Sequence, residues 1–293
     1  MRLDGKRESD NVEDARGSSG GGGGMGLPIG GRGLSLGGVV VALLASWAFG
    51  INPLTVLGLM GGDGGAPVQQ APETAPSHPT DAGGQFVSKV LADTEDVWGA
   101  YFQRTGQTYP APHLVLFRGR YPTGCGTGEA AMGPFYCPAD RKVYIDLSFY
   151  DTLRDRLGAP GDFAQAYVIA HEVGHHIQNL MGTTNKLDQA RGRVSEREAN
   201  AMSVKLELQA DCYAGVWSKL SQQASGWLDK GDIEEALNAA AQIGDDTLQK
   251  RSRGTVVPES FTHGSSAQRV SWFKRGAEAG ELKACDTFSS GTL

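Results

Sequence analysis

Apolar residues are distributed unevenly along the chain, and their pattern divides it into four parts. Residues 1–33 mix acidic and basic side chains with a glycine run at Gly20–Gly24. A segment this polar cannot bury enough apolar surface to offset its loss of conformational entropy, so we expect it to be disordered. The next stretch is different, because no charged residue occurs from Gly33 to Gly62 and the positions Leu34–Ile51 are mainly apolar.

This apolar stretch is long enough for one membrane crossing. We therefore expect residues 34–57 to form a transmembrane signal anchor. A cleaved signal peptide is the alternative, but the segment before the apolar core is too long and no small-x-small cleavage site follows it. Arg32 precedes the stretch and Asp63 is the first charge after it. This weak bias predicts a single-pass protein with its N-terminus in the cytoplasm and membrane lipid as a partner.

Residues 58–84 are rich in proline, glycine, alanine and polar side chains, which indicates an extended linker. The periodicity of residues 85–290 predicts one folded domain of α+β class, rich in helices. Ser195 and Glu198 have capping-box spacing and mark one helix start. The expected helices are Phe86–Gln103, Phe163–Met181, Ser195–Leu220 and Asp232–Leu248, and the expected strands are His113–Phe117 and Lys142–Tyr150. The structure beyond Arg251 is left open.

One of these helices contains the pattern His-Glu-x-x-His, in residues 171–175. At 100° per residue, His171 and His175 lie about 40° apart and Glu172 lies about 60° from His175. Two imidazoles on one helix face can share a zinc ion, with the glutamate as general base. A surface helix without a metal is the alternative. Gly174 costs about 1 kcal/mol relative to alanine inside a helix, which indicates close approach of another backbone or of substrate, with a tolerated glycine of no special role as the equal alternative.

A catalytic zinc site holds three protein ligands, so a third must come from another element. Glu207 is the candidate, because it lies on the next long helix with Asp211 one turn later. Small side chains surround these two acids, whose burial would be costly without a compensating cation. Asp211 would accept a hydrogen bond from the free N–H of a ligating histidine. A polar, solvent-facing stripe is the alternative for this helix.

Three separated motifs, HEVGHHIQ, ELQADCYAGVW and SFTHGSSAQR, resemble those of the neutral zinc metallopeptidases of bacterial membranes. The resemblance covers residues 85–290 and includes GPFYCPADRKVYIDLSF. It implies a zincin-like fold with a small antiparallel sheet, one zinc ion per chain, Glu207 as third ligand, and a peptide or protein substrate. It also implies the bacterial inner membrane, with the catalytic domain periplasmic or extracellular. By analogy with zincin-like folds, Lys142–Tyr150 is expected to be an edge strand that pairs with substrate.

The zinc would lower the pKa of its water, and Glu172 would accept a proton and later deliver it to the leaving amine. His263 is a candidate donor to the developing oxyanion, with a structural hydrogen bond as the alternative. His176 points about 100° from His175 and is expected behind the site or partly exposed rather than as a ligand.

Composition and cysteine content narrow the function classes further. A net charge of −6 without a cluster of Lys and Arg argues against nucleic-acid binding. The four cysteines lack Cys-x-x-Cys spacing, and the expected disulfides are Cys125–Cys137 and Cys212–Cys285, with buried free thiols as the alternative. We therefore expect a membrane-anchored zinc metallopeptidase. The rival hypotheses are a membrane-tethered zinc-binding scaffold or chaperone-like module without proteolytic activity, and a zinc hydrolase of non-peptide amides.

Overall fold

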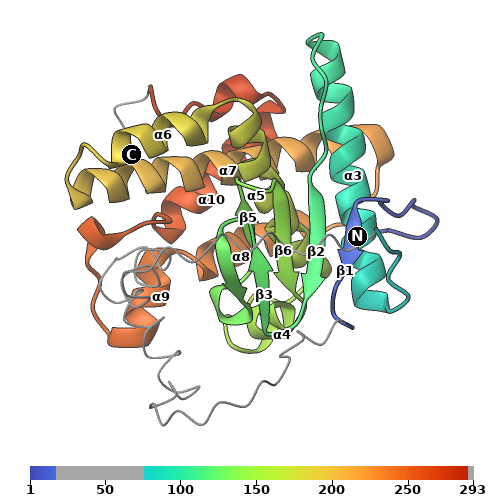
Figure 1. Cartoon of the computed structure of the whole chain (residues 1–293), viewed down its shortest axis with the longest axis horizontal. Coiled ribbons are helices and arrows are strands. Elements are labelled where there is room, and N and C mark those ends of the chain that lie inside the picture. The colour runs from blue at the N-terminus through green and yellow to red at the C-terminus, as the bar shows by residue number, and fades with distance from the viewer. Residues whose placement is uncertain (18–75, 290–293) are drawn as a thin grey trace, which may run out of the picture.

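The structure, a computed structural model, describes residues 1–17 and 76–289 (Figure 1). Its larger sheet has the strand order β1-β2-β6-β5, and β3 and β4 form a separate two-stranded antiparallel sheet. Helices pack against this sheet region, and α5, α7, α8 and α10 form the body of the domain (Figure 1). The strands are β1 (Val12–Asp14), β2 (His113–Phe117), β3 (Arg120–Thr123), β4 (Gly126–Glu129), β5 (Phe135–Cys137) and β6 (Lys142–Asp146).

Among the described residues, the long helix α3 is followed by seven further α-helices, α4 to α10. Their bounds are α3 (Ala82–Arg104), α4 (Ser148–Asp155), α5 (Asp162–Leu180), α6 (Thr183–Arg191), α7 (Glu196–Ser225), α8 (Asp232–Gln242), α9 (Asp245–Arg253) and α10 (Ser266–Ala279). Short 3-10 turns lie at Ala130–Met132, Pro258–Ser260 and Leu282–Cys285. The helix-rich α+β class is therefore confirmed.

The larger sheet is mixed rather than antiparallel. Strands β1, β2 and β6 run parallel, and only β5 pairs antiparallel with β6. The expected small antiparallel sheet is the β3–β4 pair. The expectation that Lys142–Tyr150 is an edge strand is wrong, because β6 lies between β2 and β5 and the chain turns into α4 after Asp146. The edge strand beside the helix α5 is β5 instead.

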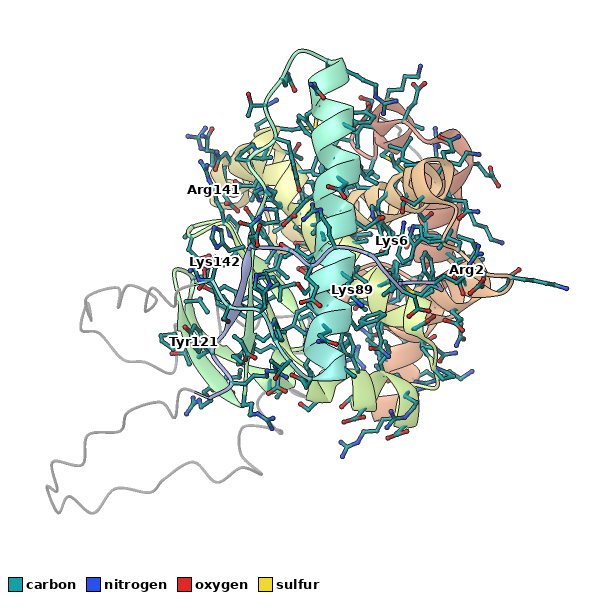
Figure 2. All side chains as sticks on the ribbon, turned by 90° about the vertical axis from the view of Figure 1, so that its right-hand side faces the viewer. Arg2, Lys6, Lys89, Tyr121, Arg141 and Lys142 are labelled. Atoms are coloured by element: carbon teal, nitrogen blue, oxygen red, sulfur yellow. A yellow bond between two sulfur atoms is a disulfide. The ribbon has the colours of Figure 1, made fainter. Side chains whose placement is uncertain are left out.

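Residues 1–17 belong to the folded domain, which corrects the expected disorder over that part of residues 1–33. Val12 pairs with Leu114 across the β1–β2 ladder, and its side chain is completely buried. Arg7 forms ion pairs with Glu95 and Asp96 on α3. Figure 2 shows the segment that carries Arg2 and Lys6 crossing the face of α3. The segment's polar composition was misleading because it completes a sheet and a core that later elements build.

The expected transmembrane segment, residues 34–57, lies outside the described residues, as do residues 18–33 and most of the expected linker. Within residues 1–17 and 76–289, no helix has the length and apolar character needed to cross a membrane. The folded part after the linker begins slightly earlier than expected, because Asp81 caps α3 by accepting a hydrogen bond from the Gly84 amide.

Helix α5 packs one face into the hydrophobic core, and another part of its surface carries His171, Glu172 and His175. Ile169, Val173 and Ile177 are completely buried on the core face, and each such side chain contributes about 1.5–3 kcal/mol relative to exposure. On the adjoining face, a Cβ atom at Gly174 would lie 3.0 Å from the Ala210 carbonyl oxygen of α7. The backbone approach expected at Gly174 is thus confirmed, and it sets the spacing between α5 and α7.

Helix α10 packs even more closely on α7. A Cβ atom on Gly276 would overlap the carbonyl group of Cys212, and one on Gly215 would overlap the carbonyl group of Phe273. Each helix therefore presents a glycine to the backbone of the other. Helix α7 begins at the expected capping box of Ser195 and Glu198, and this interface holds its central turns in place.

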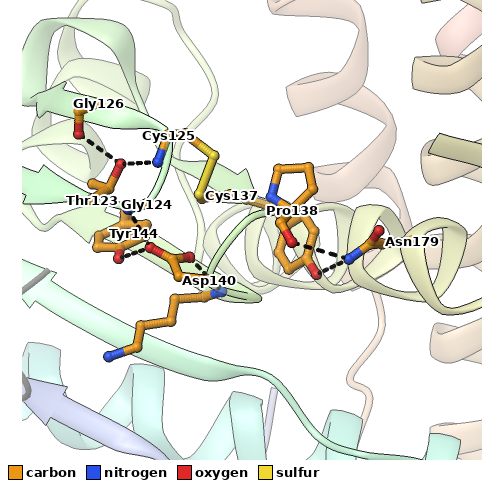
Figure 3. The surroundings of a disulfide bond; sticks show 11 residues. Thr123, Gly124, Cys125, Gly126, Cys137, Pro138, Asp140, Tyr144 and Asn179 are labelled. Atoms are coloured by element: carbon orange, nitrogen blue, oxygen red, sulfur yellow. Dashed lines mark hydrogen bonds between the residues drawn. A yellow bond between two sulfur atoms is a disulfide. The ribbon is translucent and has the colours of Figure 1, made fainter. Parts of the chain in front are cut away.

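Both expected disulfides are present, Cys125–Cys137 and Cys212–Cys285. The first joins the loop after β3 to β5, near the hydrogen bond that Asn179 of α5 donates to Pro138 (Figure 3). The second joins α7 to the C-terminal turn. The alternative of buried free thiols is therefore excluded in this structure.

Replacing Gly276 by alanine should destabilise the domain by at least about 1–3 kcal/mol, because the added methyl group forces α10 away from α7. Thermal or denaturant unfolding of the variant measures this loss. The matched control is Gly99→Ala in α3, where nothing lies within 4 Å of the new Cβ atom. That variant should gain up to about 1 kcal/mol from helix propensity. Equal stabilities of the two variants would contradict the close contact.

Candidate metal centre

Helices α5 and α7 bring His171, His175 and Glu207 together. The Nε2 atom of His171 lies 3.1 Å from Glu207 Oε2, and the Nε2 atom of His175 lies 3.5 Å from Glu207 Oε1. One ligand atom from each of the three residues lies within 4.8 Å of the others. A tetrahedral zinc with bonds of about 2.0–2.1 Å holds its ligand atoms about 3.3 Å apart. The spacing therefore suits a zinc ion shared by the three side chains.

His171 is oriented from behind by a buried network of charged and polar groups. Its Nδ1 atom lies 2.8 Å from Asp211 Oδ1, so the imidazole donates there and leaves Nε2 free as a ligand. Arg269 of α10 donates to both carboxylate oxygens of Asp211, at 2.8 and 2.9 Å. The Tyr167 hydroxyl also donates to Asp211. The hydrogen bond expected between Asp211 and a histidine is present, and the role of Asp211 in supporting a metal ligand stays a prediction.

His175 is oriented by a neutral group. Its Nδ1 atom lies 2.8 Å from Gln178 Oε1, one helical turn further along α5. Gln178 Nε2 in turn donates to the Leu206 carbonyl oxygen at 2.7 Å. Both histidines thus have a hydrogen-bond acceptor at Nδ1 and direct Nε2 toward Glu207, which is the tautomer that metal binding requires.

The electrostatics of the pocket follow from burial and charge pairing. Burial opposes ionisation of Glu207, but His175 and His171 outweigh it and hold the pKa of Glu207 well below its usual value. Burial also disfavours the Asp211 carboxylate, yet Arg269 and His171 lower the pKa of Asp211 to about 2. Both acids are therefore anionic at neutral pH. Burial lowers the pKa of His171, but Asp211 and Glu207 outweigh it and raise the pKa of His171 to about 10. A divalent cation that binds to the two acids would therefore replace the protons on the imidazoles.

Glu172 is buried on the same helix as the histidines. Burial raises the pKa of its carboxyl group, and the nearby His175 and His171 oppose that rise. A carboxyl group with a raised pKa is suited to accept and return a proton near neutral pH. Glu172 does not belong to the three-residue ligand set, which agrees with the separate role predicted for it.

His263 lies in the loop before α10, and its side chain is 40% exposed. Its Nδ1 atom is 3.3 Å from Asp245 Oδ1, and its backbone amide donates to Asp245 Oδ2 at 2.7 Å. Burial lowers the pKa of His263, and the hydrogen bond to Asp245 more than compensates, so the pKa is raised overall. The charge of His263 also contributes to the low pKa of Glu207.

His176 has a structural role. Its Nδ1 atom accepts from the Tyr136 hydroxyl at 3.0 Å, and its Nε2 atom donates to the Pro110 carbonyl oxygen at 2.7 Å. The imidazole is 1% exposed, so it is not partly exposed as one expectation had it. It joins α5 to β5 and to the loop before β2.

Four further residues contact the candidate site residues but were not predicted from the sequence: Tyr167, Gln178, Asp245 and Arg269. Tyr167 precedes His171 by four residues and Gln178 follows His175 by three, so helical spacing could have identified both. Arg269 stands in the SFTHGSSAQR motif, but nothing local shows that it reaches Asp211. Asp245 fell in the last turn of one expected helix, Asp232–Leu248. That helix is wrong as a single element, because the chain breaks at Gly244 between α8 and α9.

A second group of acids, Asp162, Asp232 and Glu235, lies at the starts of α5 and α8. The Met1 ammonium group lies 3.1 Å from Asp162 and 3.4 Å from Asp232. This cluster already has a cationic partner within the described residues, so it is no second candidate for the zinc.

Two histidines one helical turn apart and a glutamate from a neighbouring helix have the residue types and spacing of a catalytic zinc site, in which a fourth position is left for water or substrate. The comparison with known families agrees. Residues 1–288 match the family described as "Putative neutral zinc metallopeptidase", and the chain belongs to that family.

Two relatives show how far the similarity extends. The chain is 54% identical to "Uncharacterized protein YpfJ" of Escherichia coli over 98% of this chain and 99% of that protein. It is 45% identical to "Uncharacterized protein Mb2605" of Mycobacterium bovis over 63% of this chain and 65% of that protein. No solved structure matches the chain.

The buried His176 predicts a pH dependence of stability. Burial lowers its pKa in the folded protein to about 4, so between about pH 6.5 and pH 4 the unfolded chain binds a proton that the folded chain does not. Stability should therefore fall as the pH is lowered through this window, by up to about 3 kcal/mol from this group. Denaturant unfolding of wild type and His176→Gln between pH 7 and pH 4 isolates it. Parallel pH profiles of the two proteins would contradict a buried neutral imidazole.

Proposed function

We propose that this chain hydrolyses peptide bonds with the aid of one zinc ion held by His171, His175 and Glu207. The observation that carries the proposal is a buried Glu172 beside a three-residue ligand set whose Nε2 and carboxylate atoms face one another. Family membership supports the same chemistry. A general base beside three ligands is the arrangement that hydrolysis needs.

A zinc ion at this position supplies a Lewis acid and lowers the pKa of a water molecule toward 7. The protein's own residues divide the remaining tasks. Glu172 accepts the proton of the attacking water and returns it to the leaving amine. Asp211 and Gln178 fix the tautomers of the two histidines. His263, partly exposed and held by Asp245, donates a hydrogen bond to the oxyanion that develops on the scissile carbonyl.

The rival hypothesis of a zinc-binding scaffold explains Glu172 less well. A structural zinc site closes its fourth position with a protein ligand. Among the described residues, three side chains at this site have ligand atoms close enough together to share a metal ion, those of His171, His175 and Glu207. A hydrolase of non-peptide amides would use the same groups, and the cleavage assay below separates it from a peptidase. Attachment to the bacterial inner membrane is a separate proposal that rests on the sequence of residues 34–57.

The decisive experiment compares zinc content and peptide cleavage in the full chain and its variants. Wild type should bind one zinc per chain and cleave members of a peptide library. Glu172→Gln should keep the zinc and lose at least about 100-fold in kcat, because it removes the proton acceptor. Glu207→Ala should lose both zinc and activity, because a ligand is missing. His263→Ala should keep the zinc and lower kcat more than it changes KM.

The outcomes separate the hypotheses. Undiminished cleavage by Glu172→Gln would exclude this residue as the base, and full zinc binding by Glu207→Ala would exclude that residue as a ligand. Zinc binding by wild type without cleavage of any peptide, together with cleavage of a small amide, would favour the non-peptide hydrolase. Gln165→Met, a change on α5 away from the ligands, is the control for general damage to that helix.

A further inference from the structure

A chain of side-chain amides leads from His175 to the C-terminal disulfide. Gln178 accepts from His175 Nδ1 at 2.8 Å and donates through Nε2 to Gln209 Oε1 at 3.2 Å. Gln209 Nε2 donates to the Cys285 carbonyl oxygen at 3.0 Å. Cys285 is bonded to Cys212, which lies one helical turn after Gln209 on α7. Three segments distant in the sequence are thus connected behind one metal ligand.

The orientation of the two glutamine amides is fixed by the backbone carbonyl groups to which they donate. The backbone carbonyls of Leu206 and Cys285 can only accept hydrogen bonds, so they orient the NH2 groups of Gln178 and Gln209 toward themselves. The Gln178 oxygen is then the atom that faces His175. Because that oxygen can only accept, His175 must carry its proton on Nδ1 and offer Nε2 to a metal.

Burial makes this orientation costly to change. Gln178 is completely buried and Gln209 is 7% exposed. Turning either amide around would leave a buried carbonyl without its donor, which costs about 1–3 kcal/mol for each group. His171 does not share this support, since its acceptor Asp211 is held by Arg269 instead.

We infer that Gln178 and Gln209 are positioning residues for His175, and that the Cys212–Cys285 disulfide anchors the chain of hydrogen bonds on which His175 depends. Reduction of this disulfide frees the Cys285 segment, removes the acceptor from Gln209 and weakens zinc binding through His175. This inference rests on the proposed zinc centre, but it concerns zinc affinity and not peptide hydrolysis.

The first test measures zinc affinity of the full chain by competition with a chelator. Gln178→Met should weaken zinc binding about 10–100-fold, as loss of a ligand's supporting hydrogen bond does elsewhere. Gln165→Met, the same change on the same helix, should not. The absorption spectrum of the cobalt-substituted protein should change in Gln178→Met and remain that of wild type in Gln165→Met. Unchanged affinity in Gln178→Met would overturn the inference.

The second test uses the two disulfides as a matched pair. Cys212→Ser/Cys285→Ser should weaken zinc binding, whereas Cys125→Ser/Cys137→Ser should leave it unchanged. Adding Gln209→Met to Cys212→Ser/Cys285→Ser should cause no further loss, because both changes break one chain of hydrogen bonds. If the two changes lowered zinc affinity independently, so that their fold-losses multiplied in the combined variant, the proposed coupling would be overturned. If the serine variant does not fold, the Gln178→Met result still decides the role of the amides. Zinc binding without peptide cleavage would refute the proposed function and leave this inference intact.

A different observation concerns the ends of residues 18–75. The residues on either side of this segment are hydrogen-bonded to one another, since Ser77 N donates to the Val12 carbonyl oxygen at 2.8 Å and Asp14 N donates to Ser77 Oγ at 2.9 Å. Arg16 also forms ion pairs with Asp14 and Asp81. β1 continues this contact into the sheet by pairing with β2. A single membrane crossing would instead separate the two ends by the hydrocarbon core of about 30 Å.

We propose that residues 1–17 and 77–289 lie on the same side of the membrane, in place of the expected arrangement with the N-terminus inside and the domain outside. Two crossings would need about 40 apolar residues, whereas the mainly apolar stretch Leu34–Ile51 is 18 residues long in all. The order β1-β2-β6-β5 could not form if β1 and β2 were separated by a bilayer.

The test compares labelling of two exposed positions in the full chain. Asp10 is 90% exposed before the segment and Arg154 is 56% exposed after it. Asp10→Cys and Arg154→Cys are treated separately with a membrane-impermeant maleimide in intact spheroplasts, and in permeabilised cells as a control for reactivity. We expect both cysteines to be labelled in intact spheroplasts, or both to be protected. Labelling of one position and protection of the other in intact spheroplasts would overturn the proposal.

Discussion

The candidate site depends on the close contact between α5 and α7 at Gly174. His171 and His175 lie on one helix and Glu207 on the other, and their ligand atoms must come within a few ångströms of one another. A side chain at Gly174 would push the Ala210 backbone away. The glycine that weakens α5 as an isolated helix therefore makes the three-residue site possible. The glycine contacts between α7 and α10 extend this close packing to a third helix.

Because the helices pack closely, the acidic side chains of the site are removed from water and need cationic partners. Asp211 is completely buried and Glu207 is 17% exposed, and cationic partners keep both side chains charged there. Arg269 supplies one such partner from α10, so helix packing and charge compensation depend on the same interface. The two histidines are then supported differently, one by a charged pair and the other by neutral amides. Disturbing α10 or the C-terminal disulfide should therefore affect different ligands.

Local sequence signals predicted most helices because their causes are local. The capping box at Ser195 and the apolar stripe of α5 both fall within a few turns of one helix. The predicted helix Asp232–Leu248 failed because its break has a distant cause. Gly244 lies against Ser266 of α10, where a side chain would not fit, and Asp245 beyond the break binds the backbone of the loop that holds His263. Periodicity along one segment carries no information about such a contact.

The sequence by itself was enough to single out the two histidines, Glu172 as candidate base and Glu207 as candidate third ligand, because helical spacing converts residue number directly into a shared face. It also determined the helix-rich class and offered the correct cysteine pairing. Only the tertiary structure decided that Arg269, Gln209 and Cys285 support the ligands, that β6 lies inside the sheet, and that residues 1–17 complete it. These features join residues far apart in the chain, and their free energy comes from burial and pairing that no single segment contains.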